Sequence, residues 1–224
     1  MTANLPATDV DVLRRLAGEW AAALDDTRRA ETARLWTRLN DRQSVRPMVW
    51  ITETPWHEMN INDELTGQCL DPWARDQETL LRRTLYQWRH FPADMILADY
   101  LACPLAIRNT RFGLEEDADI ARTDAASGVV SRRFHRQIVD ETDLDKIKPA
   151  LVTHDAAATE ERYQRMCAVY DGILPVRKEG IKHIWYTPWD NLVCWWGVEE
   201  ALLDLLDRPE LVDEAVARCA ASMN

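Results

Sequence analysis

The segment FPADMILADYLACPLAI, residues 91–107, constrains the fold more than any other stretch of the chain. A helical pattern stops before it at Phe91-Pro92, and the apolar residues 95–98 lead directly to the carboxylate of Asp99. A short apolar run between polar residues is typical of a strand buried on both faces, although periodicity alone leaves a short buried helix open. Ligands bind at the carboxyl ends of parallel strands. We therefore expect Asp99 at the ligand-binding edge of a parallel sheet.

Helical and strand patterns alternate along the rest of the chain. Helices are predicted over residues 8–39, 72–90, 155–170, 199–206 and 209–220, and strands over 48–51, 95–98 and 173–180. Residues 108–142 carry short apolar runs between glycines, which indicates a small antiparallel excursion from the main sheet. Alternating strands and helices predict an α/β fold with a parallel sheet.

Composition narrows the classes of partner. The formal net charge is −11 and basic residues form no cluster, so a nucleic-acid or anionic membrane surface is not expected. No apolar run approaches the ~20 residues of a membrane span, and the first residues lack the apolar core of a signal peptide. The five cysteines are widely spaced and fit reduced thiols. We expect a cytoplasmic protein, and we predict no metal-binding residues in this chain.

Tryptophan is unusually frequent, and six of the ten tryptophans lie in two stretches. Residues 46–60, RPMVWITETPWHEMN, bring Glu53, His57 and Glu58 into an aromatic turn, and residues 183–197, HIWYTPWDNLVCWWG, bring a second turn at Pro188-Trp189. Clustered aromatics beside polar turn residues line apolar ligand cavities, although they also fill ordinary cores.

These segments, in this order, resemble the uroporphyrinogen decarboxylase-like superfamily, which includes methyltransferases that use corrinoid cofactors or thiols. The resemblance covers residues 45–224 and rests on RPMVWITETPW, FPADMILADYLACPLAI, DLDKIKPALVTHD and the run from PVRKEG to LVDEAV. It implies a partial (β/α)8 TIM barrel of the uroporphyrinogen decarboxylase type. The expected domains are an N-terminal helical extension, residues 1–45, and the N-terminal half of the barrel, residues 46–224, with its small β excursion.

A half-barrel would leave a sheet edge and an apolar interior open, so we expect self-association through the open barrel edge or pairing with another chain. In decarboxylases of the family, an aspartate at the position of Asp99 binds the pyrrole NH groups of the substrate. Their two arginines after the first strand are absent from TETPWHEMN here, and Val193-Cys194-Trp195 replaces a later tyrosine.

The resemblance therefore implies that the full-length protein is an enzyme of the methyltransferase branch. Such an enzyme moves a methyl group between a small methylated substrate and a corrinoid or thiol acceptor. Porphyrinogen decarboxylation and a non-catalytic binding role are the alternatives. No cofactor is expected in this chain. The resemblance places the zinc ligands of the family beyond Asn224, so a zinc ion and a corrinoid protein are expected only with the full-length protein. We predict Asp99 and His57 as catalytic residues, and the expected substrate-binding residues are Glu53, Glu58, Tyr186, Trp189 and Asp190. The structural alternatives are a helix cap for Asp99, a surface pair for His57 and Glu58, and core positions for the aromatic residues.

Overall fold

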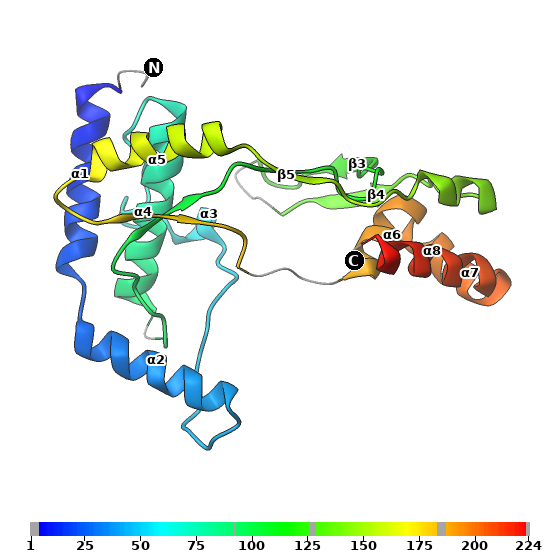
Figure 1. Ribbon diagram of the computed structural model, residues 1–224, viewed down its shortest axis with the longest axis horizontal. Helices are drawn as coiled ribbons and strands as arrows, with labels where there is room; N and C mark the ends of the chain where they lie inside the picture. Colours follow the sequence, from blue (N-terminus) through cyan, green and yellow to red (C-terminus); the bar gives the residue numbers. More distant parts are fainter. Residues whose placement is uncertain (1–4, 92, 126–128, 183–186, 223–224) are drawn as a thin grey trace. The chain divides into compact units, whose positions relative to one another are not determined.

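The computed structural model describes residues 5–91, 93–125, 129–182 and 187–222 (Figure 1). These residues form a mixed α/β protein in which helices are long and strands are short. The chain divides into two compact units. Unit 1 comprises Met1–Pro104 and Ala157–Gly180, and unit 2 comprises Leu105–Ala156 and Ile181–Asn224. The domain boundary expected near residue 45 falls inside unit 1.

Helices make up most of unit 1. Those expected from the sequence are α1 (Ala7–Ala22), α2 (Asp26–Asn40), α4 (Pro72–His90) and α5 (Ala156–Tyr170), and the short α3 (Trp56–Met59) lies where a turn was expected. Helix α4 begins where Asp71 accepts a hydrogen bond from the Ala74 amide and Pro72 occupies the first position. Helices α1 and α4 lie against each other (Figure 1), and their apolar faces meet Met166 of α5 in the core.

Two parallel strands complete unit 1, as the alternating pattern predicts. Strand β1 (Leu101–Pro104) pairs with β6 (Val176–Glu179) in a register that runs from Leu101 opposite Val176 to Pro104 opposite Glu179. The strand predicted at 173–180 is confirmed in its second half.

The strands predicted at residues 48–51 and 95–98 are wrong. Both stretches are extended but belong to no ladder, and Val49 and Trp50 are exposed. The amide and carbonyl of Val49 bond only to the side chain and backbone of Asp94, so pairing does not continue to the next residue. The chain then bends at residues 99–100, and regular pairing begins only at Leu101, opposite β6.

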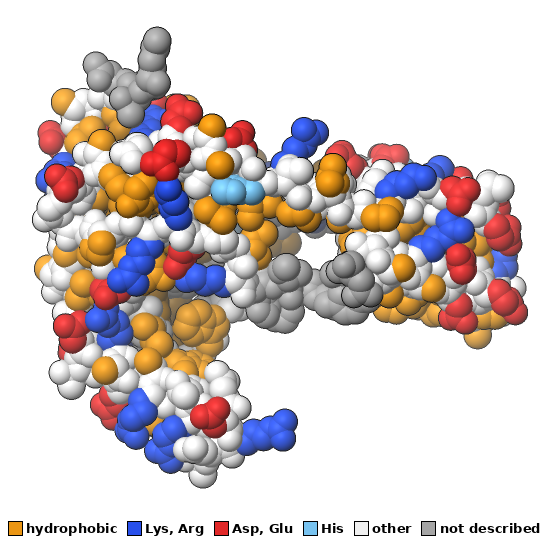
Figure 2. Space-filling model, viewed as in Figure 1, with side chains coloured by type: hydrophobic (Ala, Val, Ile, Leu, Met, Phe, Trp, Pro, Cys, Tyr) orange, Lys and Arg blue, Asp and Glu red, His pale blue; other side chains and the backbone are white. Residues whose placement is uncertain are grey.

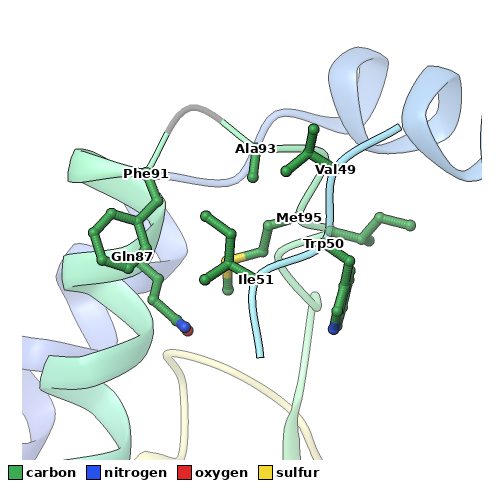
Figure 3. A pocket seen from close by; sticks show the side chains of 8 residues that line it. Val49, Trp50, Ile51, Gln87, Phe91, Ala93 and Met95 are labelled. Atoms are coloured by element: carbon green, nitrogen blue, oxygen red, sulfur yellow. The ribbon is translucent and has the colours of Figure 1, made fainter. Parts of the chain in front are cut away.

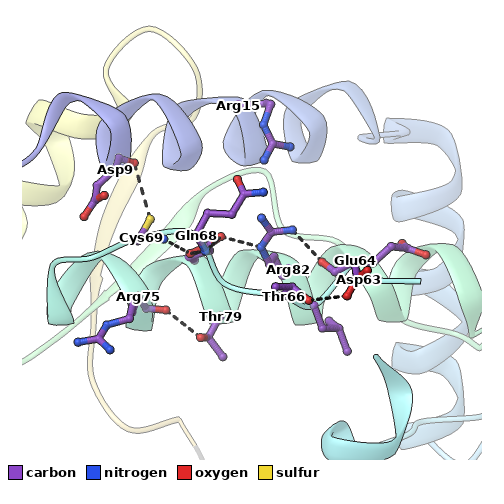
Figure 4. Close-up of polar contacts among 12 residues, drawn as sticks. Asp9, Arg15, Asp63, Glu64, Thr66, Gln68, Cys69, Arg75, Thr79 and Arg82 are labelled. Carbon is purple, nitrogen blue, oxygen red and sulfur yellow. Dashed lines mark hydrogen bonds and ion pairs between the residues drawn. The ribbon is translucent and has the colours of Figure 1, made fainter. Parts of the chain in front are cut away.

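Two buried carboxylates fix the loop that precedes α4. Figure 4 shows Gln68 and Cys69 of this loop and Asp9 of α1, whose backbone carbonyl also accepts from the Cys69 thiol. Glu78 accepts hydrogen bonds from the Gln68 and Cys69 amides and from Arg82 Nε, at 2.7–3.0 Å. Asp9 of α1 accepts from the next two amides of the loop, at 2.8 and 3.0 Å. A buried charge is tolerated when its oxygens are saturated in this way. The two carboxylates therefore tie the loop to the α1–α4 pair.

Unit 2 contains the antiparallel excursion and the C-terminal helices. Strand β3 (Ala118–Ala121) pairs with β4 (Ser131–Phe134) in antiparallel fashion, as expected for residues 108–142. Strand β2 (Ile107–Asn109) pairs antiparallel with β5 (Val152–His154), which lies beyond the predicted excursion. The remaining elements are the 3-10 helix η1 (Glu141–Lys146) and the helices α6 (Pro188–Trp196), α7 (Val198–Asp207) and α8 (Pro209–Ala221). Leu192, Trp195 and Trp196 of α6 form the centre of this unit's core. Across the described residues of both units, every helix is too short or too polar to cross a bilayer.

Candidate functional site

The β1–β6 pair has one covered face and one open face, because side chains alternate along a strand. Leu101 and Cys103 of β1 are buried in the helical core. On the same face, Lys178 of β6 lies over the ring of Tyr163 in α5, with its ammonium 4.6 Å from the ring centroid. The alternate residues, including Ala102 and Arg177, are exposed. A ligand that binds to this sheet would therefore contact its open face.

Charged and aromatic side chains gather on this open face. The Arg177 guanidinium lies 4.2 Å from the centroid of the Tyr100 ring, and the Tyr100 hydroxyl donates a hydrogen bond to Glu179. Stacking on an aromatic ring holds a guanidinium flat and leaves its edge available for a carboxylate or phosphate. Tyr100 thus organises both charges of β6 on this face.

Asp99 stands at the beginning of this face, two residues before β1. One carboxylate oxygen lies 3.0 Å from Arg29 Nη1 of α2, and the other lies 3.8 Å from Arg177 Nη2. The Trp20 indole of α1 donates to the carbonyl of Ala98, at 2.8 Å, and fixes the backbone directly before the acid. The sequence placed Asp99 after a strand, but the structure places it before one, because pairing starts later than the apolar run suggests.

Half of the Asp99 side chain remains buried: it is 42% exposed. Arg29 is shared with Asp26, at 2.8 Å, and Glu179 lies on the neighbouring strand, so carboxylates balance both arginines. Such a mixed set of donors and acceptors binds a polar or zwitterionic small molecule by charge-assisted hydrogen bonds. It can also transfer a proton through Asp99, which is accessible to solvent.

An apolar slot lies along the same segment of chain, and Figure 3 shows it from close by. Its volume is about 80 Å³, and it is lined by Val49, Trp50, Ile51, Gln87, Phe91, Ala93, Met95 and Ile96. This volume is well below the ~300 Å³ at which ordinary ligand pockets begin, so the slot fits only a group of a few atoms. Ile96 precedes Asp99 by three residues, which places their Cα atoms at most about 11 Å apart.

The other predicted site residues do not converge on Asp99 in the described part of the chain. Glu53, His57 and Glu58 are exposed in unit 1, and His57 Nε2 lies 3.4 Å from Glu58 Oε1, which is the surface pair that the sequence left open. Trp189 and Asp190 are exposed on α6 of unit 2. Tyr186 lies outside the described residues. Their grouping around one ligand stays a prediction.

Sequence reasoning missed four residues of the open face, which are Arg29, Tyr100, Arg177 and Glu179. The alternation of Tyr100, Ala102 and Pro104 could have identified β1 and its open face. The apolar run at residues 95–98 was instead interpreted as the strand. Arg29 offered no signal, since it reaches Asp99 only through the packing of α2.

No group of three or more histidine, cysteine, aspartate or glutamate residues in the described ranges is arranged to hold a metal ion. Comparison of the chain with protein-family models, with curated proteins and with solved structures gave no match. The open face and the slot are thus the observations on which a function must be argued.

Proposed function

We propose that this chain is a uroporphyrinogen decarboxylase-like protein that moves a methyl group between a small methylated substrate and a thiol or corrinoid acceptor. The parallel β1–β6 pair supports the proposal, because helices cover one of its faces and charged side chains occupy the other. Helices on one face of a parallel strand pair are also found in the wall of a (β/α)8 barrel, although such barrels bind ligands at the carboxyl ends of their strands and Asp99 lies at the amino end of β1. A partial barrel is part of the same proposal.

The observation that carries the proposal is the position of Asp99 on the segment that also lines the apolar slot. The slot is large enough for a methyl-bearing group, and Trp50 is one of the residues that line it. An aromatic face attracts a methylated ammonium. The polar part of the same substrate would then reach Asp99 and Arg177.

In this scheme the thiol acceptor gives its proton to the Asp99 carboxylate, and the thiolate forms the new bond to the methyl carbon. With a methyl ether as donor, the C–O bond breaks and Asp99 passes the proton to the oxygen, which departs as an alcohol. With a methylated ammonium as donor, the electrons of the C–N bond stay on nitrogen, and a neutral amine departs without a proton. His57, exposed beside Glu58, is the expected proton carrier to solvent. Any corrinoid or zinc belongs to the acceptor side, and no step here passes through either.

The test follows the transfer of a methyl group from an aryl methyl ether to a thiol by the absorbance of the released phenol, with the purified chain in catalytic amount. Asp99→Asn is expected to lower the rate about 10²-fold or more, the range for loss of a positioned acid. Asp76→Asn is the matched control, because Asp76 is an exposed carboxylate on α4 and the charge change is the same. An unchanged rate in Asp99→Asn, or no turnover with any thiol or corrinoid acceptor, contradicts the proposal.

A second candidate is decarboxylation of a porphyrinogen, and one observation favours it. Residues 52–60 contain no arginine, but Arg29 and Arg177 lie within 4 Å of Asp99 and can hold substrate carboxylates. Formation of a coproporphyrinogen from uroporphyrinogen, lost in Arg177→Met, would support this candidate over methyl transfer.

A further inference from the structure

Helix α7 of unit 2 exposes an apolar stripe on the side away from its own core. The stripe consists of Val198, Leu202, Leu205 and Leu206, and their spacing of four, three and one residues places them on one helix face. Leu206 is 83% exposed and Leu202 is 60% exposed. A folded domain rarely leaves several large apolar side chains together in water unless they meet a partner.

The opposite side of α7 is already occupied, so the stripe is not a misplaced core face. Ala201 is buried in the core formed with α6 and α8. Asp204 is buried beside it and accepts hydrogen bonds from the Trp196 indole and from Arg136 Nη2, both at 2.7 Å, and from Arg208. These contacts fix the rotation of α7 and hold the stripe outward.

The surroundings of the stripe are acidic. Residues 188–221 contain eight acidic residues and two arginines. Both arginines are paired within the unit: Arg208 Nε lies 2.9 Å from Asp204, and Arg218 bonds Glu214 and Asp145 at 2.8 and 2.7 Å. The exposed carboxylates of Glu199 and Asp207 therefore flank the stripe, and no cation of the described residues pairs with either of them. Figure 2 shows acidic side chains gathered where Figure 1 labels α7 and α8.

The negative charge around the stripe determines which kind of partner can bind there. A second copy would bring two sets of like charges together, which opposes self-pairing at this face. An anionic membrane surface is repelled for the same reason. An amphipathic helix with leucines on one side and lysines or arginines beside them matches both the stripe and its rim.

We propose that α7 is the docking surface for a basic amphipathic helix of a partner protein, bound by packing of its apolar side on the stripe and by ion pairs with Glu199 and Asp207. This is the mode in which apolar side chains at helical spacing supply affinity and flanking charges supply specificity. The interaction is independent of the chemistry at Asp99, which lies in unit 1.

The test is a fluorescence-anisotropy titration of the full chain with a labelled amphipathic peptide of leucine and lysine, and with a scrambled peptide of the same composition. The amphipathic peptide is expected to bind at least tenfold more tightly than the scrambled one, and added salt is expected to weaken its binding. The double substitution Leu202→Gln and Leu206→Gln is expected to lower its affinity by tenfold or more. Glutamine is a good helix former, so α7 is retained.

Ile120→Thr is the control, because Ile120 is another exposed apolar residue of unit 2, on β3. Its binding is expected to equal that of the wild type, and circular dichroism checks that all variants are folded. Equal binding of the scrambled peptide overturns the proposal, as does unchanged binding by the double variant. A wild-type dimer that the double variant converts to a monomer would also overturn it, since the stripe would then belong to a second copy.

Discussion

The ion pair between Asp94 and Arg46 gives the sharpest test of how unit 1 is held together. The Asp94 carboxylate accepts hydrogen bonds from Arg46 Nη1 at 2.9 Å and from the Val49 amide at 2.8 Å. The bonds from Arg46 lower the pKa of Asp94 from 3.8 to about 2, against the opposing effect of burial. Asp94→Asn removes this stabilisation and releases the extended segment that carries the apolar slot.

The magnitude follows from the pKa shift. Each pKa unit corresponds to about 1.4 kcal/mol, so a shift from 3.8 to about 2 corresponds to about 2 kcal/mol of stability at neutral pH. The folded pKa lies below the unfolded one, so this contribution is fully present above about pH 4 and is lost as the pH falls towards 2. The asparagine variant cannot titrate at this position, and its difference from wild type should shrink over the same window.

Hydrogen exchange of the Val49 amide is the local readout, because that amide donates to Asp94. Urea unfolding followed by circular dichroism gives the global value. Arg46→Met should remove the same contribution, and the double variant should lose little more than either single one, since the two residues share one interaction. Asp76→Asn serves as the control for a surface charge. A difference below about 0.5 kcal/mol at neutral pH, or one that stays constant down to pH 2, would refute the reasoning.

Further outcomes are expected elsewhere in the chain. Asp204→Asn should cost about 3 kcal/mol in urea unfolding, because it leaves a buried indole and two guanidinium groups with a weaker acceptor. Gly113→Ala should destabilise by about 1–3 kcal/mol, because φ is +85° and the new Cβ would lie 2.9 Å from a carbonyl oxygen. Gly18→Ala, in open space on α1, should instead stabilise by up to about 1 kcal/mol. Hydrogen bonding to Asp117 and to a second carboxylate raises the pKa of His135 above 6.5, so its stabilisation is present below that pH and is lost as the pH rises through the raised value. An NMR titration should show the imidazole pKa falling towards 6.5 in Asp117→Asn.

Local patterns predicted the helices well. Helix α4 begins at Pro72, directly after its N-cap residue Asp71, so neighbouring residues determine where it begins. The bounds of α5, α7 and α8 also agree with the sequence-based ranges to within a residue or two. The antiparallel excursion was also predicted, because glycines and short apolar runs mark it locally.

The positions of the strands in unit 1 could not be predicted from neighbouring residues alone. Residues 48–51 and 95–98 have the composition of buried strands, yet neither joins a ladder, and pairing begins at Leu101. A ladder needs a partner at every second residue, and that partner comes from a distant part of the chain. Composition alone does not say where the partner begins.

The sequence by itself determined the helical framework, one strand of the parallel pair and the presence of an acid beside an apolar run, because each depends on periodicity or on neighbouring residues. Only the tertiary structure decided what surrounds that acid. Arg29 reaches Asp99 from a helix 70 positions earlier, and Arg177 reaches it from a strand 78 positions later. Such contacts follow from how elements pack, which no single stretch of sequence encodes.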